Sequence, residues 1–457
     1  MNRVAHRTTI ALLLAMVLVA GMSLFLLEFV TKADDWAVFP GNPHVYTGVN
    51  IGCGIITDRD GTVLLDASEG RVYAEDEELR LSTLHWMGDR YGFISAPAVS
   101  HYSNEMAGYD LLNGLYSYSG TGGIAKMTVS ADVQKVALDA MGDRKGTVAV
   151  YNYKTGEILC AGSTPTYDPD DVPDIEGDES GRYEGVYLNR FTQVDYVPGS
   201  IFKLITSAAA LELDDSLADL EFNCTASYEI QGDKVTCEQY HGTVDMEKAL
   251  AKSCNCYFAQ LMLYLGGDTM EKYVDQMQVF ERVSFDGITS SAGHFDIENA
   301  VDVEKAWAGI GQYTDLVNPC RFMTVMGAIA GKGEAAMPHI VQEVSSGMRV
   351  NYSAKPESTG KLLSRNTAKK LTEMMRNAVQ VTYGDGNFPS GMNVCAKSGT
   401  AQVDGKRPNA TFAGFCANEN YPLAFICVVE NAGGGSDICV PIVGEVLEAC
   451  QEVLDRE

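Results

Sequence analysis

One serine and one lysine are spaced so that they could carry out acyl transfer together. In the run YVPGSIFK at residues 196–203, a Pro-Gly pair precedes Ser200, and a helix-forming stretch rich in alanine and leucine follows Lys203. Ser200 is therefore expected in the first turn of a helix, with Lys203 three positions on and on the same face. Unpaired backbone N–H groups at a helix start favour a developing negative charge. The pattern suits a serine nucleophile with a lysine base, although so short a motif also arises by chance.

Two further short motifs could supply the partners that such a serine needs. The first is S-C-N at residues 253–255, and the second is K-S-G-T at residues 397–400, in a strand-like run. Each has an ordinary structural explanation, as a helix cap beside an asparagine and as an edge strand with a glycine bulge. The occurrence of all three motifs in this order favours one catalytic site over three coincidences.

The chemistry that these residue types suit is acyl transfer through a covalent serine intermediate. Lys203 can accept the Ser200 proton only in its neutral form, so its pKa must be lowered. Burial beside Phe202 and the positive charge of Lys397 would both lower that pKa.

Charge and composition argue against several other classes of function. The 457 residues are 46% hydrophobic and 21% charged, with a formal net charge of −27. Such an acidic chain lacks the basic footprint of a nucleic-acid-binding protein, and it is not suited to an anionic cytoplasmic membrane surface. The 7 histidines are scattered, and Cys254-x-Cys256 has no second pair beside it. We therefore expect no metal site.

The first thirty residues indicate a membrane anchor. Basic residues within the first seven positions precede a low-polarity run over 10–27, which is long enough to span a bilayer, and two aspartates follow at 34–35. This charge asymmetry places the N-terminus in the cytoplasm and the remaining chain outside it. A cleaved signal peptide is the alternative, which the length of the run and the lack of a small-x-small site disfavour.

The remaining chain shows a change from strands to helices and back to strands. Residues 146–161 form two apolar runs around a Lys-Thr-Gly turn, which is typical of a β-hairpin. Helical spacing dominates from residue 200 to about 375. Strand patterns return at 394–401, 411–416 and 423–430, and a helix over 442–454 ends the chain. The predicted fold class is α+β, with one five-stranded antiparallel sheet covered by helices.

Residues 31–125 and the cysteines allow less definite expectations. The segment 31–125 has many turns and short strand candidates but no catalytic cluster, so we expect a non-catalytic module there. Cys224 and Cys237 flank a short polar segment and are the best candidates for a disulfide in an exported chain. Whether they are paired stays open.

The three motifs together resemble those of the penicillin-binding proteins, which are serine D,D-transpeptidases. Asn189-Arg190 before the first motif, His241-Gly242 before the second and the G-I-G-Q run at 309–312 add to the resemblance. It is strong over about 125–457 and weaker before that, in the manner of the class B, monofunctional branch. It implies a transpeptidase/β-lactamase-like fold, with the four segments 1–9 (cytoplasmic tail), 10–30 (transmembrane anchor), 31–125 (pedestal or dimerisation-like domain) and 126–457 (transpeptidase domain).

The resemblance also implies a role for each motif residue. Ser200 is the nucleophile and Lys203 its base, while Ser253 passes a proton to the leaving amine and Asn255 holds the substrate amide. The third motif binds the terminal carboxylate of the substrate, through catalytic Lys397 and the substrate-binding residues Ser398, Gly399 and Thr400. The oxyanion hole is implied at the backbone N–H groups of Ser200 and Thr400.

The implied activity is peptidoglycan cross-linking. The enzyme takes the D-Ala-D-Ala end of a stem peptide, releases the last D-Ala and passes the acyl group to an amine on a neighbouring strand. β-Lactam antibiotics acylate the same serine, and neither a metal nor an organic cofactor is implied. The implied partner is a membrane glycan polymerase of the SEDS type (shape, elongation, division and sporulation).

Two alternatives stay open. The first is a D,D-carboxypeptidase or a β-lactamase on the same fold, although the sequence shows no extra carboxylate placed for fast deacylation. The second is a non-enzymatic membrane β-lactam sensor. A sensor needs a cytoplasmic signalling domain, and only residues 1–9 precede the anchor.

Overall fold

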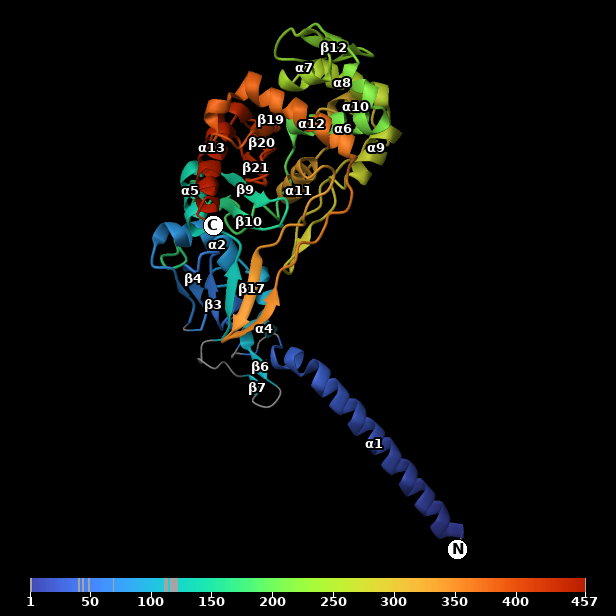
Figure 1. Ribbon diagram of the computed structural model, residues 1–457, viewed down its shortest axis with the longest axis vertical. Coiled ribbons are helices and arrows are strands. Elements are labelled where there is room, and N and C mark those ends of the chain that lie inside the picture. Colours follow the sequence, from blue (N-terminus) through green and yellow to red (C-terminus); the bar gives the residue numbers. More distant parts are fainter. Residues whose placement is uncertain are drawn as a thin grey trace.

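The computed structural model describes residues 2–456 except 40–41, 43–44, 48–49, 69, 111–113 and 116–121. Helix α1 (Asn2–Ala37) extends away from the rest of the molecule (Figure 1). Its segment Arg3–Ala33 is long and apolar enough to cross a membrane, with a mean hydropathy of 2.8 over an 18-residue window. None of that window packs against the rest of the chain, which fits the anchor expected from the sequence.

The sheet nearest α1 is built from two distant parts of the sequence. Its strands, in spatial order, are β18 (Arg349–Ser353), β17 (Val341–Ser346), β8 (Ile124–Met127), β3 (Ile55–Thr57), β4 (Val63–Asp66) and β5 (Val72–Tyr73). Strands β3 and β8 are parallel, and the other neighbours are antiparallel. The hairpin β17–β18 therefore completes a sheet whose first strand in the chain, β3, begins at Ile55, while the domain boundary near 125 stays a prediction.

The central sheet has the five antiparallel strands that the sequence predicted. Their spatial order is β10 (Ile158–Thr164), β9 (Gly146–Asn152), β21 (Leu423–Val429), β20 (Asn409–Cys416) and β19 (Val394–Ala401). The first and last strand pairs along the chain meet where β21 lies beside β9. This leaves β19, which carries the K-S-G-T motif, at one edge of the sheet.

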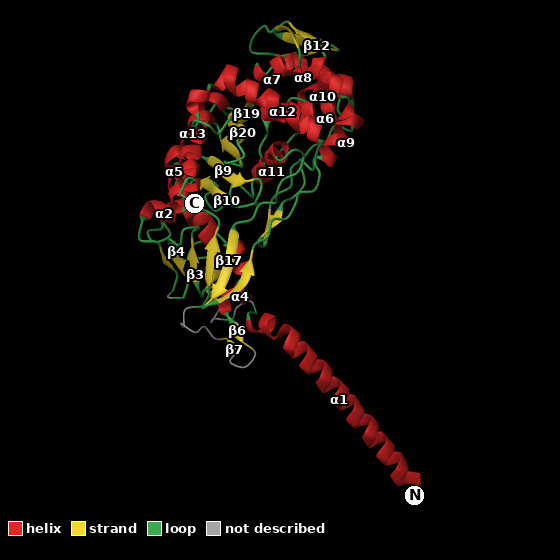
Figure 2. Ribbon diagram, viewed as in Figure 1, coloured by secondary structure: helices red, strands yellow, loops and turns green. Residues whose placement is uncertain are grey.

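Helices cover both faces of this sheet (Figure 2). Helices α5 (Ala131–Met141) and α13 (Gly435–Leu454) lie on one face, and α11 (Pro319–Ala330) lies on the other. The alternation along β20 shows why, because Phe412 joins the core beneath α13 and Phe415 joins the opposite core. Helix α13 begins at Gly435, seven residues before the predicted start at residue 442. Pro441 therefore lies inside the helix, although proline is better tolerated in the first turn.

The part of the chain predicted to be helical carries the helices around the first two motifs. They are α6 (Lys203–Leu213), α7 (Met246–Ala251), α8 (Asn255–Leu265), α9 (Gly267–Gln276), α10 (Asp302–Ala308) and α12 (Arg365–Ala378). Short strands interrupt them, notably the hairpin β12 (Ser227–Ile230) and β13 (Asp233–Thr236). This hairpin lies at the end of the molecule opposite α1 (Figure 1).

Candidate active site

The first motif lies on a tight turn at the start of α6. Residues Gly199–Phe202 form a 3₁₀ turn, and Lys203 is the first residue of α6. Ser200 therefore lies just before the α-helix, in a tighter turn than the sequence predicted, and it is partly exposed. Lys203 is completely buried. The hydroxyl can meet a substrate, whereas the amine is shielded from solvent.

The second motif holds the Lys203 amine. Its Nζ donates to the backbone oxygen of Ser253 at 2.7 Å, to Ser253 Oγ at 3.1 Å and to Asn255 Oδ1 at 2.6 Å. Asn255 Nδ2 donates to the backbone oxygen of Thr236 at 2.8 Å, which fixes the direction of the amide. The S-C-N residues therefore bind and orient the lysine that was predicted as the base.

A strained backbone conformation brings Ser253 to Lys203. Ser253 has φ +53°, in the left-handed region that non-glycine residues seldom adopt. It lies in the short link between α7 and α8, and Cys254 caps α8 by accepting a hydrogen bond from the Tyr257 N–H. The turn aims both the backbone oxygen and the hydroxyl of Ser253 at Lys203. Strain of this kind is common where a side chain must be aimed at a functional group.

Burial makes Lys203 a usable base. Desolvation lowers the pKa of Lys203 to about 7, and the positive charge of Lys397 acts in the same direction. Nearby thiols of Cys237 and Cys254 oppose part of this shift. An amine with a pKa about 7 is neutral in a large fraction of molecules near neutral pH, as a general base requires.

Two glycines bring the nucleophile turn against strand β19. A Cβ on Gly399 would lie 2.3 Å from Thr411 Oγ1 and 2.8 Å from the Pro198 oxygen. A Cβ on Gly199, which has φ +59°, would lie 3.1 Å from the Thr400 backbone. Thr411 Oγ1 also donates to the Pro198 oxygen at 3.1 Å. The backbone around Ser200 therefore lies directly beside Thr400, as the implied oxyanion hole needs.

Tyr383 contacts the third motif, and sequence reasoning missed it. Its hydroxyl accepts from the Ser398 N–H at 2.8 Å, lies 3.0 Å from Ser398 Oγ and accepts from Lys397 Nζ at 3.5 Å. Burial raises the pKa of Tyr383, so the phenol keeps its proton. Tyr383 ends a π-helical turn, Val379–Tyr383, and no local pattern shows that this turn reaches β19.

Lys397 is the second buried amine of the site. It is completely buried, and its Nζ donates to the Ser398 backbone oxygen at 2.8 Å. Desolvation lowers the pKa of Lys397 to about 7. Together with Tyr383, this places a cationic donor and the Ser398 hydroxyl on the edge strand, where an anionic group could bind.

The G-I-G-Q run packs behind the nucleophile turn. Gly199 N–H donates to the Gly311 oxygen at 2.8 Å, and Thr206 Oγ1 donates to the Gly309 oxygen at 2.7 Å. Gly311 has φ +83°, and a Cβ there would lie 2.3 Å from the Gly199 oxygen. Gly311 is therefore needed for the close approach of this run to the turn that carries Ser200, whereas a Cβ on Gly309 would meet the Met262 side chain on α8.

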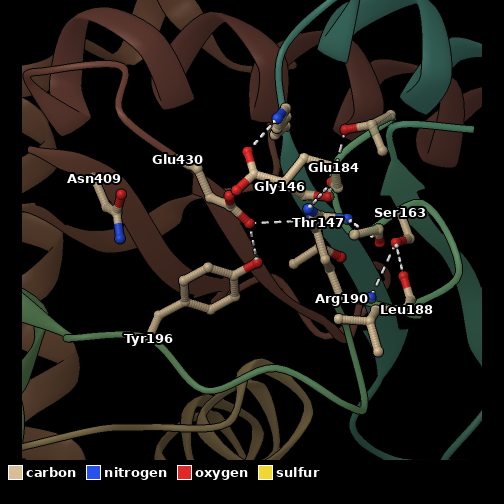
Figure 3. A network of polar contacts seen from close by, with 12 residues as sticks. Gly146, Thr147, Ser163, Glu184, Leu188, Arg190, Tyr196, Asn409 and Glu430 are labelled. Carbon is tan, nitrogen blue, oxygen red and sulfur yellow. Dashed lines mark hydrogen bonds and ion pairs between the residues drawn. The ribbon is translucent and has the colours of Figure 1, made fainter. Parts of the chain in front are cut away.

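A buried ion pair holds the chain that leads to the nucleophile (Figure 3). Arg190 Nε donates to Glu430 Oε1 at 2.8 Å, and Tyr196 Oη donates to the same oxygen at 2.9 Å. The Arg190 N–H also donates to Ser163 Oγ at 2.9 Å, at the end of β10. These contacts give a structural role to Arg190 of the Asn189-Arg190 pair noted in the sequence, because they fix residues 190–196 to the end of the central sheet.

The predicted site residues thus lie in one region. Contacts join Lys203 to Ser253 and Asn255, and close packing puts the Ser200 turn beside Gly399 and Thr400. Their catalytic roles stay predictions.

This α+β fold with its three motifs is the arrangement that the resemblance to the penicillin-binding proteins implied. Residues 146–448 match the family model described as the penicillin binding protein transpeptidase domain. The chain belongs to this family, and the resemblance stated from the motifs is confirmed.

Two curated relatives show the extent of the similarity. Stage V sporulation protein D of Bacillus subtilis is 28% identical over 345 residues, which cover 70% of this chain and 52% of that protein. Peptidoglycan D,D-transpeptidase PbpA of Mycolicibacterium smegmatis is 28% identical over 340 residues, 68% of each chain. The match therefore spans about half of the first relative and two thirds of the second.

Solved structures confirm the fold. The D,D-transpeptidase domain of a peptidoglycan glycosyltransferase from Eggerthella lenta matches with a TM-score of 0.75 at 24% identity, over 88% of this chain and 98% of that one. The penicillin G acyl-enzyme complex of penicillin-binding protein A from M. tuberculosis matches with a TM-score of 0.74 at 22% identity, over 88% and 99%. The predicted α+β fold class is confirmed.

Proposed function

We propose that this chain is a membrane-anchored peptidoglycan D,D-transpeptidase that works through an acyl-enzyme on Ser200. The observation that carries the proposal is the buried Lys203 amine, which Ser253 and Asn255 hold one turn from the Ser200 hydroxyl. Curated relatives named peptidoglycan D,D-transpeptidase support it. So does a structural neighbour captured as an acyl-enzyme with penicillin G.

The proposed acylation step begins with neutral Lys203. Its Nζ accepts the Ser200 proton while Ser200 Oγ attacks the carbonyl carbon of the penultimate D-Ala. The C–N bond to the last D-Ala breaks, and the proton passes through Ser253 to the leaving amine. In the second step an acceptor amine attacks the ester carbon, the new N–C bond forms, the C–O bond to Ser200 Oγ breaks, and the proton that the amine loses passes to Ser200 Oγ. The backbone N–H groups of Ser200 and Thr400 stabilise the oxyanion in both steps.

The third motif recognises the terminal carboxylate of the donor. Charged Lys397 attracts it, and the hydroxyls of Ser398 and Thr400 donate hydrogen bonds to it. The carboxylate of a β-lactam would bind in the same place, which accounts for acylation of Ser200 by these drugs.

The anchor and the relatives suggest where and with whom the enzyme works. Helix α1 spans the membrane with its N-terminus in the cytoplasm, so the active site faces the cell wall. A solved structure described as a peptidoglycan synthase complex, which coordinates polymerisation and cross-linking, matches 72% of this chain with a TM-score of 0.61. This supports a membrane glycan polymerase of the SEDS type as the partner.

Covalent labelling with a fluorescent penicillin tests the nucleophile. The full-length protein should form a stable adduct, and Ser200→Ala should abolish it. Ser207→Ala is the matched control on α6, because the buried Ser207 hydroxyl has no hydrogen-bond partner among the described residues and should be dispensable. Labelling that survives in Ser200→Ala would overturn the assignment.

The products distinguish the alternatives on the same fold. A transpeptidase should release D-Ala from a lipid-linked glycan only together with cross-links. Release without cross-links would identify a carboxypeptidase. Rapid turnover of the penicillin adduct would identify a β-lactamase.

A further inference from the structure

Three cysteines and one histidine meet directly behind the S-C-N motif. The sulfurs of Cys224, Cys237 and Cys254 and a ring nitrogen of His241 all lie within 4.8 Å of one another. The sequence motifs did not predict this cluster, because the four residues come from three separate segments of the chain. They are the end of β11 (Phe222–Cys224), the loop between β13 and β14 (Gly242–Val244), and the cap of α8.

Three of the distances between ligand atoms in this cluster match the edges of a tetrahedral metal site. His241 Nδ1 lies 3.5 Å from the sulfurs of both Cys224 and Cys237, and the sulfurs of Cys237 and Cys254 are 3.8 Å apart. A tetrahedron with zinc bonds of about 2.3 Å to sulfur and about 2.0 Å to nitrogen has edges of about 3.8 Å and about 3.5 Å. The 3.8 Å separation is far above a disulfide bond length of about 2.05 Å. Cys224 and Cys237, the disulfide candidates from the sequence, are free thiols in the structure.

Backbone N–H groups point at two of the sulfurs. The Asn255 N–H donates to Cys237 Sγ at 3.0 Å, and the Tyr257 N–H donates to Cys254 Sγ at 3.4 Å. Both donors belong to the first turn of α8, where the helix dipole also favours negative charge. Cys224 and Cys254 are fully buried, so a bound ion would be largely shielded from solvent.

We propose that Cys224, Cys237, His241 and Cys254 bind one Zn²⁺ ion in a tetrahedral Cys₃His site. Thiolate and imidazole ligands select this soft-to-borderline ion over Mg²⁺ or Ca²⁺. All four positions are occupied by protein ligands, so the ion is structural and takes no part in the acyl transfer.

The ion supplies stability to a part of the fold that has little core of its own. The hairpin β12–β13 buries only Ile230 and Val235 among its apolar side chains, and an isolated two-stranded hairpin is marginally stable in water. Zinc ties the segments on either side of this hairpin to the start of α8, and metal binding contributes directly to the stability of such small elements.

The same ion positions a residue of the site. Cys254 stands between Ser253 and Asn255, and the Thr236 oxygen, one residue before Cys237, accepts from Asn255 Nδ2 at 2.8 Å. Zinc therefore holds Cys254, which precedes Asn255 in the chain, and Cys237, which follows the residue that accepts the Asn255 hydrogen bond. This second part of the proposal rests on the proposed function, whereas the metal site itself does not.

Metal analysis of the full-length protein tests the site without any substrate. Protein purified in detergent from zinc-supplemented cells, with no chelator, should carry about one zinc per chain. Cys224→Ser and His241→Ala should each lower this to below about a tenth, because a four-ligand site loses most of its affinity with one ligand. Cys53→Ser, in the bend just before β3, is the matched control and should keep its zinc. Wild-type protein without zinc, or a Cys224–Cys237 disulfide in unreduced peptides, would overturn the proposal.

Cobalt substitution keeps the test valid if a variant fails to fold. Wild-type protein stripped with a strong chelator and reloaded with Co²⁺ should show thiolate-to-cobalt charge-transfer absorption typical of a tetrahedral site. Absence of that absorption in folded protein would contradict the ligand set.

Reversible loss of acylation tests the positioning role. Chelation should slow acylation by fluorescent penicillin by about tenfold, and Zn²⁺ but not Mg²⁺ should restore it. An unchanged rate in zinc-free protein would show that the ion does not position Asn255. The zinc content would still be measured if the protein formed no adduct at all, so failure of the proposed function remains distinguishable.

Discussion

Two buried lysines compete for protonation in the free enzyme. Lys203 and Lys397 are both completely buried, and desolvation lowers the pKa of each to about 7. The proposed reaction needs Lys203 neutral and Lys397 charged. Near neutral pH a fraction of molecules has this arrangement, and binding of an anionic substrate increases it by stabilising charged Lys397.

The second-order rate constant for acylation should therefore follow a bell-shaped pH profile centred near 7. Below this pH, protonation of Lys203 removes the base, and the rate should fall about tenfold per pH unit. Above it, deprotonation of Lys397 weakens carboxylate binding. Stopped-flow acylation with a chromogenic cephalosporin gives the profile.

Lys397→Arg is the control for the alkaline limb. A guanidinium stays charged, so this limb should move to higher pH. The acidic limb should move slightly to lower pH, because a permanent charge at this position lowers the pKa of Lys203. An acidic limb that moved to higher pH with Lys397→Arg would contradict the assignment of the base.

Tyr383 offers a second prediction at this scale. Tyr383→Phe removes the acceptor of the Ser398 N–H and the partner of its hydroxyl, at a cost of about 1–3 kcal/mol for an unsatisfied buried donor. Acylation should slow by about tenfold, mainly through weaker substrate binding, because Ser398 loses its fixed orientation. Tyr421→Phe, which removes an exposed hydrogen bond to Asp455, should leave the rate unchanged. Equal effects of both variants would show that Tyr383 does not orient Ser398.

At the scale of elements, the site depends on how closely the nucleophile turn approaches β19. Gly399→Ala would place a methyl group 2.3 Å from Thr411 Oγ1 and 2.8 Å from the Pro198 oxygen, so the turn must move away from the strand. Overpacking of this kind costs about 1–3 kcal/mol in stability, and misplacement of the nucleophile by an ångström can cost about a hundredfold in rate.

Comparison with a glycine in open space separates the two effects. A Cβ on Gly386 would meet nothing within 4 Å, so Gly386→Ala should change neither stability nor acylation. Thermal unfolding and penicillin labelling measure them separately. A Gly399→Ala protein that labels at the wild-type rate would contradict the close-approach argument.

The elements also show what could be predicted from the sequence. The five strands and the three motifs were predictable because alternating apolar runs and short spacings are local patterns. Tyr383, the cluster around Cys237 and the pairing of β17 with β8 were not, because each joins segments far apart in the chain. The positive φ of Ser253 could not be predicted either, because serine rarely adopts this conformation and its residue type therefore does not indicate it.

At the scale of the whole molecule, the sheet near α1 is joined to the central domain. Arg80 pairs with Asp168 at 2.6 Å, Trp86 Nε1 donates to the Ala161 oxygen at 2.9 Å, and Gln134 Nε2 donates to the Ser82 oxygen at 2.9 Å. Strand β17 belongs to this sheet although it follows the first two motifs in the chain. The two sheets are therefore connected by several chain crossings and by buried polar contacts, and they should unfold together.

Truncation of the chain tests this coupling. A chain of residues 126–457 loses β3, the first half of β8 and helix α2 (Glu77–Met87), which exposes the edge of β17 and the face of α5 that packs on α2. Its unfolding temperature should be well below that of the full-length protein, and it should aggregate through the open strand edge. A chain of residues 31–457 lacks only apolar surface that packs on nothing, so it should keep its unfolding temperature and its penicillin labelling. Calorimetry and labelling of the two chains give the comparison, and equal stability of both would mean that the sheet near α1 is an independent attachment, because its loss would then cost the catalytic part nothing.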